Sequence, residues 1–144
     1  MERIVIKVVG MPNDGDPDRM IKWFCEVFDL SNGKDNDNIE EQILKRFILN
    51  QGNGDGLSSS QLNADLETHL ARSTLIYHLN RFIDAGLLVR KGRRYHLRAN
   101  ELSKTIEELE YDIDREMKRL HHVAEEFERI MLSPRQPRRL RGGD

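Results

Sequence analysis

Apolar residues recur every seven positions from Asn100 onward, and this period constrains the fold more strongly than any other feature of the sequence. The residues that share this stripe are Leu102, Ile106, Leu109, Ile113, Leu120, Val123, Phe127 and Ile130. Glu116 is the one interruption in four heptads, a pattern that predicts a coiled-coil seam. Because an amphipathic helix of this kind has little reason to persist alone in water, it needs a partner surface. The sequence therefore predicts a dimerisation helix over 100–132, with parallel and antiparallel pairing both open.

Two capping boxes mark helix starts in the middle of the chain. Asn38 precedes Glu41 by three positions, and Ser58 precedes Gln61 by the same spacing. In such a box the first side chain accepts from a backbone amide and the second reaches back to the cap. The first helix is predicted to end at the turn-rich sequence NQGNGDG, and the second is predicted to be short.

A third helix and a tight hairpin are predicted next. The helix covers about 72–85 and is stopped by Gly86, whose freedom at positive φ suits a helix end. The sequence LLVRKGRRYHLR alternates like a hairpin, with Gly92 and Arg93 as its two-residue turn. Three helices followed by a hairpin form a winged helix-turn-helix. The predicted fold class is α+β, mainly α, with this winged domain over 37–99.

The flanking segments complete the predicted organisation. The β-branched run 4–9 predicts one strand covered on both faces, and Asp16 is placed to cap a helix over about 17–30. Together they make an N-terminal strand-helix extension over 1–36, followed by a polar linker, SNGKDNDN. The last segment, 133–144, is rich in arginine, has no packing pattern and is predicted to be disordered.

Positive charge is concentrated between Arg72 and Arg98. Seven basic residues lie there against one acid, Asp84, which gives a local net charge of +6 on a chain whose formal total is −2. On a helix that turns ~100° per residue, the apolar residues from Leu75 to Ile83 share one face. The side chains on the opposite arc are Ser73, Tyr77, Asn80, Arg81 and Asp84. The apolar face is predicted to dock onto the core and the opposite arc to contact a partner.

A duplex fits both basic elements. The major groove of B-DNA is about 12 Å wide and admits one helix, on which Asn80 can pair with adenine and Arg81 with guanine. Tyr77 can contact a phosphate or a thymine methyl group, and the cations of the hairpin can neutralise phosphates and release counterions. The predicted DNA-binding residues are Arg72, Ser73, Thr74, Tyr77, Asn80, Arg81, Lys91, Arg93 and Arg94.

The stretch STLIYHLNRFIDAGLLVRKGRRYHLR resembles the signature of ArsR-type winged-helix regulators, commonly S-T-V-x-x-H-L-x-x-L-x-x-A-G-L-V followed by a basic wing. The residues at the signature positions are Ser73, Thr74, Leu75, His78, Leu79, Phe82, Ala85, Gly86 and Leu87. The variant YHLNRFIDAGL is most similar to archaeal regulators of this superfamily, and the resemblance covers about 38–98. It implies a dimer that binds palindromic operators, often by pairing terminal helices. The cysteine pair that family metal sensors often carry is missing from this sequence, and Ala71 stands where a capping serine is common.

The alternative is a winged helix used for protein contact in a transcription assembly or another assembly. Protein-binding versions tend to carry apolar or acidic groups on the exposed arc, where this sequence has Asn80 and Arg81. A ligand-sensing repressor would differ only in having an effector, and the sequence identifies no small molecule for that role.

Other classes of site are not favoured. His122-x-x-Glu125 matches half of a zinc pattern found in some family sensors, but a solvated coiled-coil face explains it better, so no metal is predicted. Cys25 is the only cysteine, which excludes an intrachain disulfide, and its apolar neighbours predict a core position. No nucleotide-binding glycine motif or nucleophile elbow appears, so we expect neither enzymatic activity nor a cofactor. No apolar run approaches the ~20 residues that span a bilayer, and we expect a cytoplasmic protein.

Overall fold

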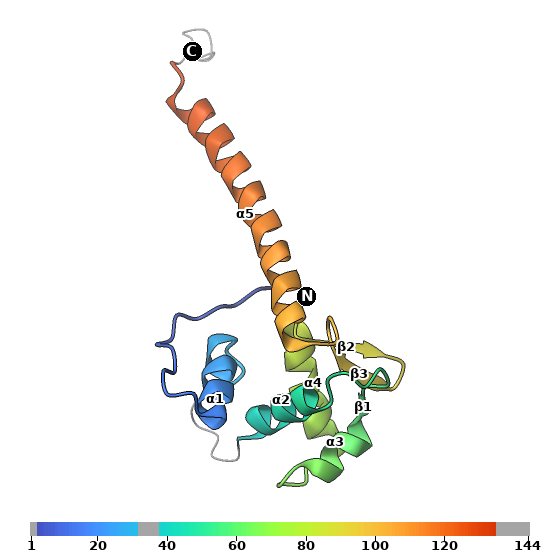
Figure 1. Ribbon diagram of the computed structural model, residues 1–144. Coiled ribbons are helices and arrows are strands. Elements are labelled where there is room, and N and C mark those ends of the chain that lie inside the picture. The colour runs from blue at the N-terminus through green and yellow to red at the C-terminus, as the bar shows by residue number, and fades with distance from the viewer. Residues whose placement is uncertain (1–2, 32–37, 135–144) are drawn as a thin grey trace. The chain divides into compact units, whose positions relative to one another are not determined.

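The computed structural model describes residues 3–31 and 38–134 (Figure 1). These residues divide into two compact units, with the boundary between Leu109 and Glu110. The elements of the first unit, in chain order, are α1 (Pro17–Val27), α2 (Ile39–Leu49), β1 (Leu57–Ser58), α3 (Ser59–Asp65), α4 (Arg72–Asp84), β2 (Leu88–Lys91) and β3 (Arg94–Leu97). Helix α5 (Leu102–Leu132) begins in the first unit and supplies the described helix of the second. The molecule is therefore α+β and mainly helical, as the sequence predicts.

A small antiparallel sheet packs against the helices α2, α3 and α4. Its strand order is β1-β3-β2, with Arg90 opposite Tyr95 across the hairpin and Leu57 opposite Tyr95 on the other side. Gly92 has φ 65°, which opens a two-residue turn between β2 and β3 and confirms the predicted hairpin. Strand β1 was not expected, since two residues carry no readable period.

Gly56 holds a position where β1 approaches β3 closely. Its φ is +69°, and a β-carbon built there would lie 2.5 Å from the carbonyl oxygen of Tyr95 and 2.7 Å from the His96 ring. Real β-carbons do not approach backbone oxygen so closely, so the contact between these strands requires glycine.

The core of the first unit lies between the helices and the sheet. Helix α4 contributes Leu75, Leu79 and Phe82, none more than 1% exposed, as its predicted apolar face requires. Ile43 from α2 and Tyr95 from β3 are buried in the same cluster. Alternation along β3 buries Tyr95 and Leu97 and leaves Arg94 exposed, as predicted for the hairpin.

Two of the three predicted helix caps are formed in the structure. The Asp16 carboxylate accepts from the Asp18 amide at 3.0 Å. Ser58 Oγ accepts from the Gln61 amide at 3.1 Å, and Gln61 Oε1 accepts from the Ser58 amide at 2.9 Å, which completes the capping box. The box predicted at Asn38 is wrong, because Asn38 has φ 55° and ψ 35° and its side chain makes no cap bond, whereas capping needs an extended backbone.

The strand predicted over 4–9 is also wrong. Residues 3–13 form no strand, and Val8 is fully exposed. The Lys7 amide donates to the carbonyl of Val27 at 2.8 Å, and Trp23 Nε1 donates to the carbonyl of Val9 at 3.1 Å. Helix α1 and its side chains thus take the backbone groups that a neighbouring strand would need. Most of the predicted linker (32–37) and most of the predicted tail (135–144) lie outside the described residues.

Candidate nucleic-acid interface

Helix α4 presents a polar arc opposite its buried face. Arg72, Ser73, Thr74 and Asn80 are exposed, and the Tyr77 ring is 60% exposed although it packs edge-on against the His78 ring. The helix begins after Ala71, whose side chain cannot cap, so no side chain bonds its first-turn amides. Open amides at a helix start favour anions such as phosphate. The arc therefore offers hydroxyls, an amide, a phenol and one guanidinium.

Arg81 does not belong to this arc. Its guanidinium donates to the carbonyl of Asp29 at 2.8 Å through Nη2 and to Glu40 Oε2 at 3.4 Å through Nη1, and its side chain is only 28% exposed. Asp29 follows the C-terminus of α1, and Glu40 lies in the first turn of α2. The prediction that Arg81 lies on the exposed arc is therefore wrong, because the long side chain bends toward the Asp29 carbonyl and the buried Glu40 carboxylate instead.

Glu40 is the residue that sequence reasoning missed. Its carboxylate is 6% exposed and lies 2.6 Å from His78 Nδ1 as well as beside Arg81, so two α4 side chains converge on one α2 acid. A buried carboxylate needs such partners to offset its desolvation. The spacing of Glu40 could have predicted its burial, since Glu40 lies on the same helical face as Ile43 and Phe47. The His78 side chain is 13% exposed, so it packs against the neighbouring elements as well as making this polar contact.

The three hairpin cations that were predicted to contact DNA fall into two groups. Arg94 Nη1 donates to Gln61 Oε1 at 3.1 Å and approaches the carbonyl of Gly56 at 3.5 Å, so Arg94 fastens β3 to the start of α3. Lys91 and Arg93 are exposed at the turn, and among the described residues their side chains have no hydrogen bond or ion pair. The second group is free to meet an external anion.

The charge of the hairpin also acts on His96. Desolvation lowers the pKa of His96 below its ordinary value, and the nearby charges of Lys91 and Arg94 lower it further, against an opposing effect of Asp55. The imidazole is therefore biased toward its neutral form.

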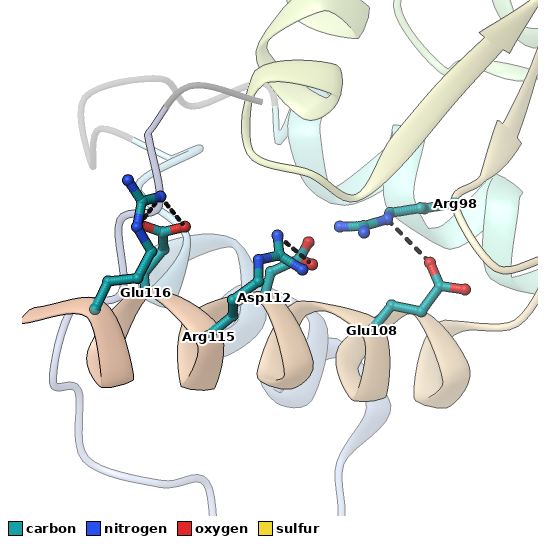
Figure 2. A network of polar contacts seen from close by, with 6 residues as sticks. Arg98, Glu108, Asp112, Arg115 and Glu116 are labelled. Atoms are coloured by element: carbon teal, nitrogen blue, oxygen red, sulfur yellow. Dashed lines mark hydrogen bonds and ion pairs between the residues drawn. The ribbon is translucent and has the colours of Figure 1, made fainter. Parts of the chain in front are cut away.

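Arg98, the last cation of the basic stretch, is tied to helix α5. Its Nε lies 3.0 Å from Glu108 Oε1, a contact drawn as a dashed line in Figure 2. The side chain is 25% exposed, so Arg98 contributes less to the exposed charge than the sequence count implies.

The predicted dimerisation residues fall into two sets. Leu109 is 2% exposed in the single chain, and Leu102 and Ile106 pack against the same core. The prediction that Leu109 joins an intermolecular seam is wrong, because its surface is already covered within its own unit. The exposed members are Leu120, Val123, Phe127 and Ile130, each 62% exposed. Ile113 is half-buried.

Ion pairs link neighbouring turns of α5. Arg115 Nη2 lies 3.2 Å from Asp112 Oδ1, a pair labelled in Figure 2. Arg119 Nη1 lies 3.1 Å from Glu116 Oε2. These pairs support an exposed helix without giving it a partner.

Other candidate sites stay minor. In the part of the chain that the structure describes, no three His, Cys, Asp or Glu side chains are arranged to hold a metal ion. Cys25 is fully buried, as predicted, and burial raises the pKa of its thiol. No helix among the described residues combines the length and apolarity needed to cross a membrane.

The comparisons with known proteins leave the family of this chain open. No protein-family profile, curated protein or solved structure matches it. The ArsR-type resemblance accordingly stays a prediction based on the signature residues between Ser73 and Leu87.

Proposed function

We propose that this protein binds double-stranded DNA as a dimeric winged-helix regulator of the ArsR type, with α4 in the major groove and the β2–β3 hairpin against phosphates. The observation that carries the proposal is the set of exposed cations without partners among the described residues: Arg72 at the start of α4 and Lys91 and Arg93 at the hairpin turn. Cations in this state release counterions when they meet a polyanion.

Sequence reading is assigned to Asn80 and Tyr77. Both side chains are exposed on α4, and Asn80 can form two bonds to the edge of an adenine. Ser73 and Thr74, one turn earlier, supply hydroxyls for the sugar-phosphate backbone. Arg81 and Arg94 have structural roles, so the surface reads fewer bases than the sequence implied.

The salt dependence of binding tests this assignment. The affinity for duplex DNA should fall with salt, and a double variant, Lys91→Ala with Arg93→Ala, should reduce the slope of log K against log salt by about 2. Lys104→Ala removes an exposed cation from α5 as a matched control and should leave the slope unchanged. Retention on DNA that does not change with salt would reject the proposal.

Selection of bound sequences from a random duplex library tests specificity. The selected sites should contain two symmetric half-sites, about one helical turn apart if both α4 helices enter successive major grooves. Asn80→Ala should cost about 1–3 kcal/mol on the selected site and relax one base position. If Asn80→Ala lost the same binding free energy on unrelated sequences, Asn80 would contact only the sugar-phosphate backbone.

One observation favours a second function, docking of another protein. With Arg81 turned inward, the exposed arc of α4 carries Arg72 at one end, Asp84 at the other and the Tyr77 ring between them. A neutral arc with an exposed aromatic ring also suits a protein partner. Flat salt dependence together with loss of partner binding on Tyr77→Ala would support this function over DNA binding.

A further inference from the structure

The second unit leaves a narrow apolar stripe uncovered. Leu120, Val123, Phe127 and Ile130 are each 62% exposed, and they occupy the alternating three- and four-residue spacing of a coiled-coil seam. Met117 and Met131, which flank the stripe, are 49% and 62% exposed. A stripe of this width fits one helix of similar pattern, and a second copy of the same chain supplies one.

Glu116 opposes a parallel arrangement of two copies. In a parallel pair in register, each seam residue meets its own counterpart. Glu116 would then face the partner's Glu116 inside the apolar seam, and two like charges at one layer destabilise the pair. Arg119 bonds Glu116 along its own helix. In a parallel pair, however, Arg119 would lie beside the partner's Ala124, so no cation from the other copy would separate the two acids.

An antiparallel pair removes this conflict. Seam positions of the two types then face each other, so that Leu120 lies opposite the partner's Val123 and Ile113 opposite the partner's Ile130. In the same register Glu116 lies opposite the partner's Phe127. The whole stripe overlaps, and no acid faces an acid within the seam.

The charges beside the seam select this register. When Leu120 lies opposite the partner's Val123, Arg119 lies beside the partner's Glu126, and the symmetric pair repeats the contact. A shift of one heptad in one direction places Arg119 against the partner's Arg119. A shift in the other direction places Glu126 against the partner's Glu126. Only the central register is free of both repulsions.

We infer that two copies of this chain pair through residues 113–130 of α5 in antiparallel orientation, centred between Leu120 and Val123. This inference rests on the dimer of the proposed function and specifies its geometry. Each copy contributes the same surface, so the interface is closed and two-fold symmetric.

Cysteine cross-linking in the full chain tests the orientation. Ile130→Cys places both thiols at one layer of a parallel pair, but about 25 Å apart along the axis of an antiparallel pair. The double variant Ile113→Cys with Ile130→Cys brings unlike positions together only in the antiparallel pair. With a short bis-maleimide, we expect the double variant to form covalent dimers and Ile130→Cys alone to form none. Glu125→Cys, on the outer face, controls for random collision, and the buried Cys25 thiol of the unaltered chain sets the background.

A charge exchange tests the register. Arg119→Glu should raise the dimer dissociation constant roughly tenfold, since two attractions become repulsions. Adding Glu126→Arg should restore the original value, and Lys118→Glu, the same charge change on the outer face, should have little effect. Sedimentation measures each constant.

Three outcomes would overturn the inference. Covalent dimers of Ile130→Cys alone would show parallel pairing, and equal effects of Arg119→Glu and Lys118→Glu would reject the register. A monomer at every concentration would reject the interface, while salt-dependent DNA retention by that monomer would leave the DNA-binding part of the proposed function standing.

Discussion

The two ends of helix α5 carry the same heptad pattern but have different environments. At the first end, Leu109 is 2% exposed and Thr105 is fully buried, with Thr105 Oγ1 accepting from the Ala99 amide at 3.0 Å. At the far end, Leu120 and Phe127 are each 62% exposed. The period defines which face of a helix is apolar, whereas the rest of the chain decides whether that face is already covered.

The same contrast occurs elsewhere in the chain. Arg81 and Arg93 belong to one basic stretch, yet Arg81 is bonded to Glu40 and Asp29 and Arg93 is exposed at the hairpin turn. Ser58 and Asn38 both begin capping boxes in the sequence, yet only Ser58 forms its cap. Pairs of variants can therefore separate groups with internal partners from groups without them.

The largest expected effect divides the two ends of α5. Leu109→Ala should lower the free energy of unfolding by about 2–5 kcal/mol, because it leaves a cavity in a core. Leu120→Ala should change the unfolding of the isolated monomer by less than about 0.5 kcal/mol, because the residue is exposed there. Urea denaturation at a protein concentration where sedimentation shows monomer measures both.

If Leu120→Ala costs as much as Leu109→Ala under those conditions, the far stripe is covered within its own chain. The contrast between the two ends would then be false, and the antiparallel pairing would lose its basis. A loss confined to the dimeric state would instead sharpen the contrast.

The second effect separates the two kinds of arginine. Arg81→Ala should lower the free energy of unfolding by about 1–3 kcal/mol, since it leaves the buried Glu40 carboxylate with one partner fewer. Arg93→Ala should stay within about 0.5 kcal/mol of the unaltered chain. Denaturation of both variants in low and high salt gives the comparison, and equal stabilities would place Arg81 back among the exposed cations.

The third effect compares the two predicted capping boxes. Ser58→Ala should cost about 1 kcal/mol, because it removes the acceptor for the Gln61 amide. Asn38→Gly should cost only a few tenths of a kcal/mol, because no side-chain cap is lost and glycine accepts the left-handed backbone. Thermal unfolding of the two variants provides the measurement, and a larger loss at Asn38 would contradict it.

The smallest effect is a pH dependence at His96. Its folded pKa lies below the ordinary value of 6.5, so between those two pH values the unfolded chain binds more protons. The contribution of His96 to stability is therefore complete above about pH 6.5 and decreases as the pH falls through that window. His96→Gln should flatten the profile there, measured as the urea midpoint from pH 5 to 7. An unchanged profile would show that other groups dominate.

Local patterns predicted a large part of the fold. The cap at Asp16, the box at Ser58, the hairpin around Gly92 and the buried face of α4 each depend on neighbours within a few residues. The wrong predictions depend on distant groups. Residues 4–9 are of strand-forming types, but their backbone groups bond to α1. No pattern within the run predicts these contacts.

The candidate site shows the same limit. A helical wheel places Arg81 near Asn80, but it treats each side chain as a fixed vector, and a guanidinium on a long stem can reach sideways to a buried carboxylate. The sequence does contain one indication of this contact. Glu40 lies on the same helical face as Ile43 and Phe47, and an acid that is buried with apolar residues requires a cation or an imidazole nearby. Asn80 and Tyr77, with shorter reach or a rigid ring, lie where the wheel places them.

Position 56, where β1 meets the hairpin, has no room for a side chain. Only a hydrogen atom fits between its backbone and the Tyr95 carbonyl, which a β-carbon would approach to 2.5 Å. Any side chain at position 56 would have to push β1 away from β3, and it would weaken the contact between Arg94 and the Gly56 carbonyl. The placement of the hairpin that carries Lys91 and Arg93 thus depends on a glycine in a different strand connection.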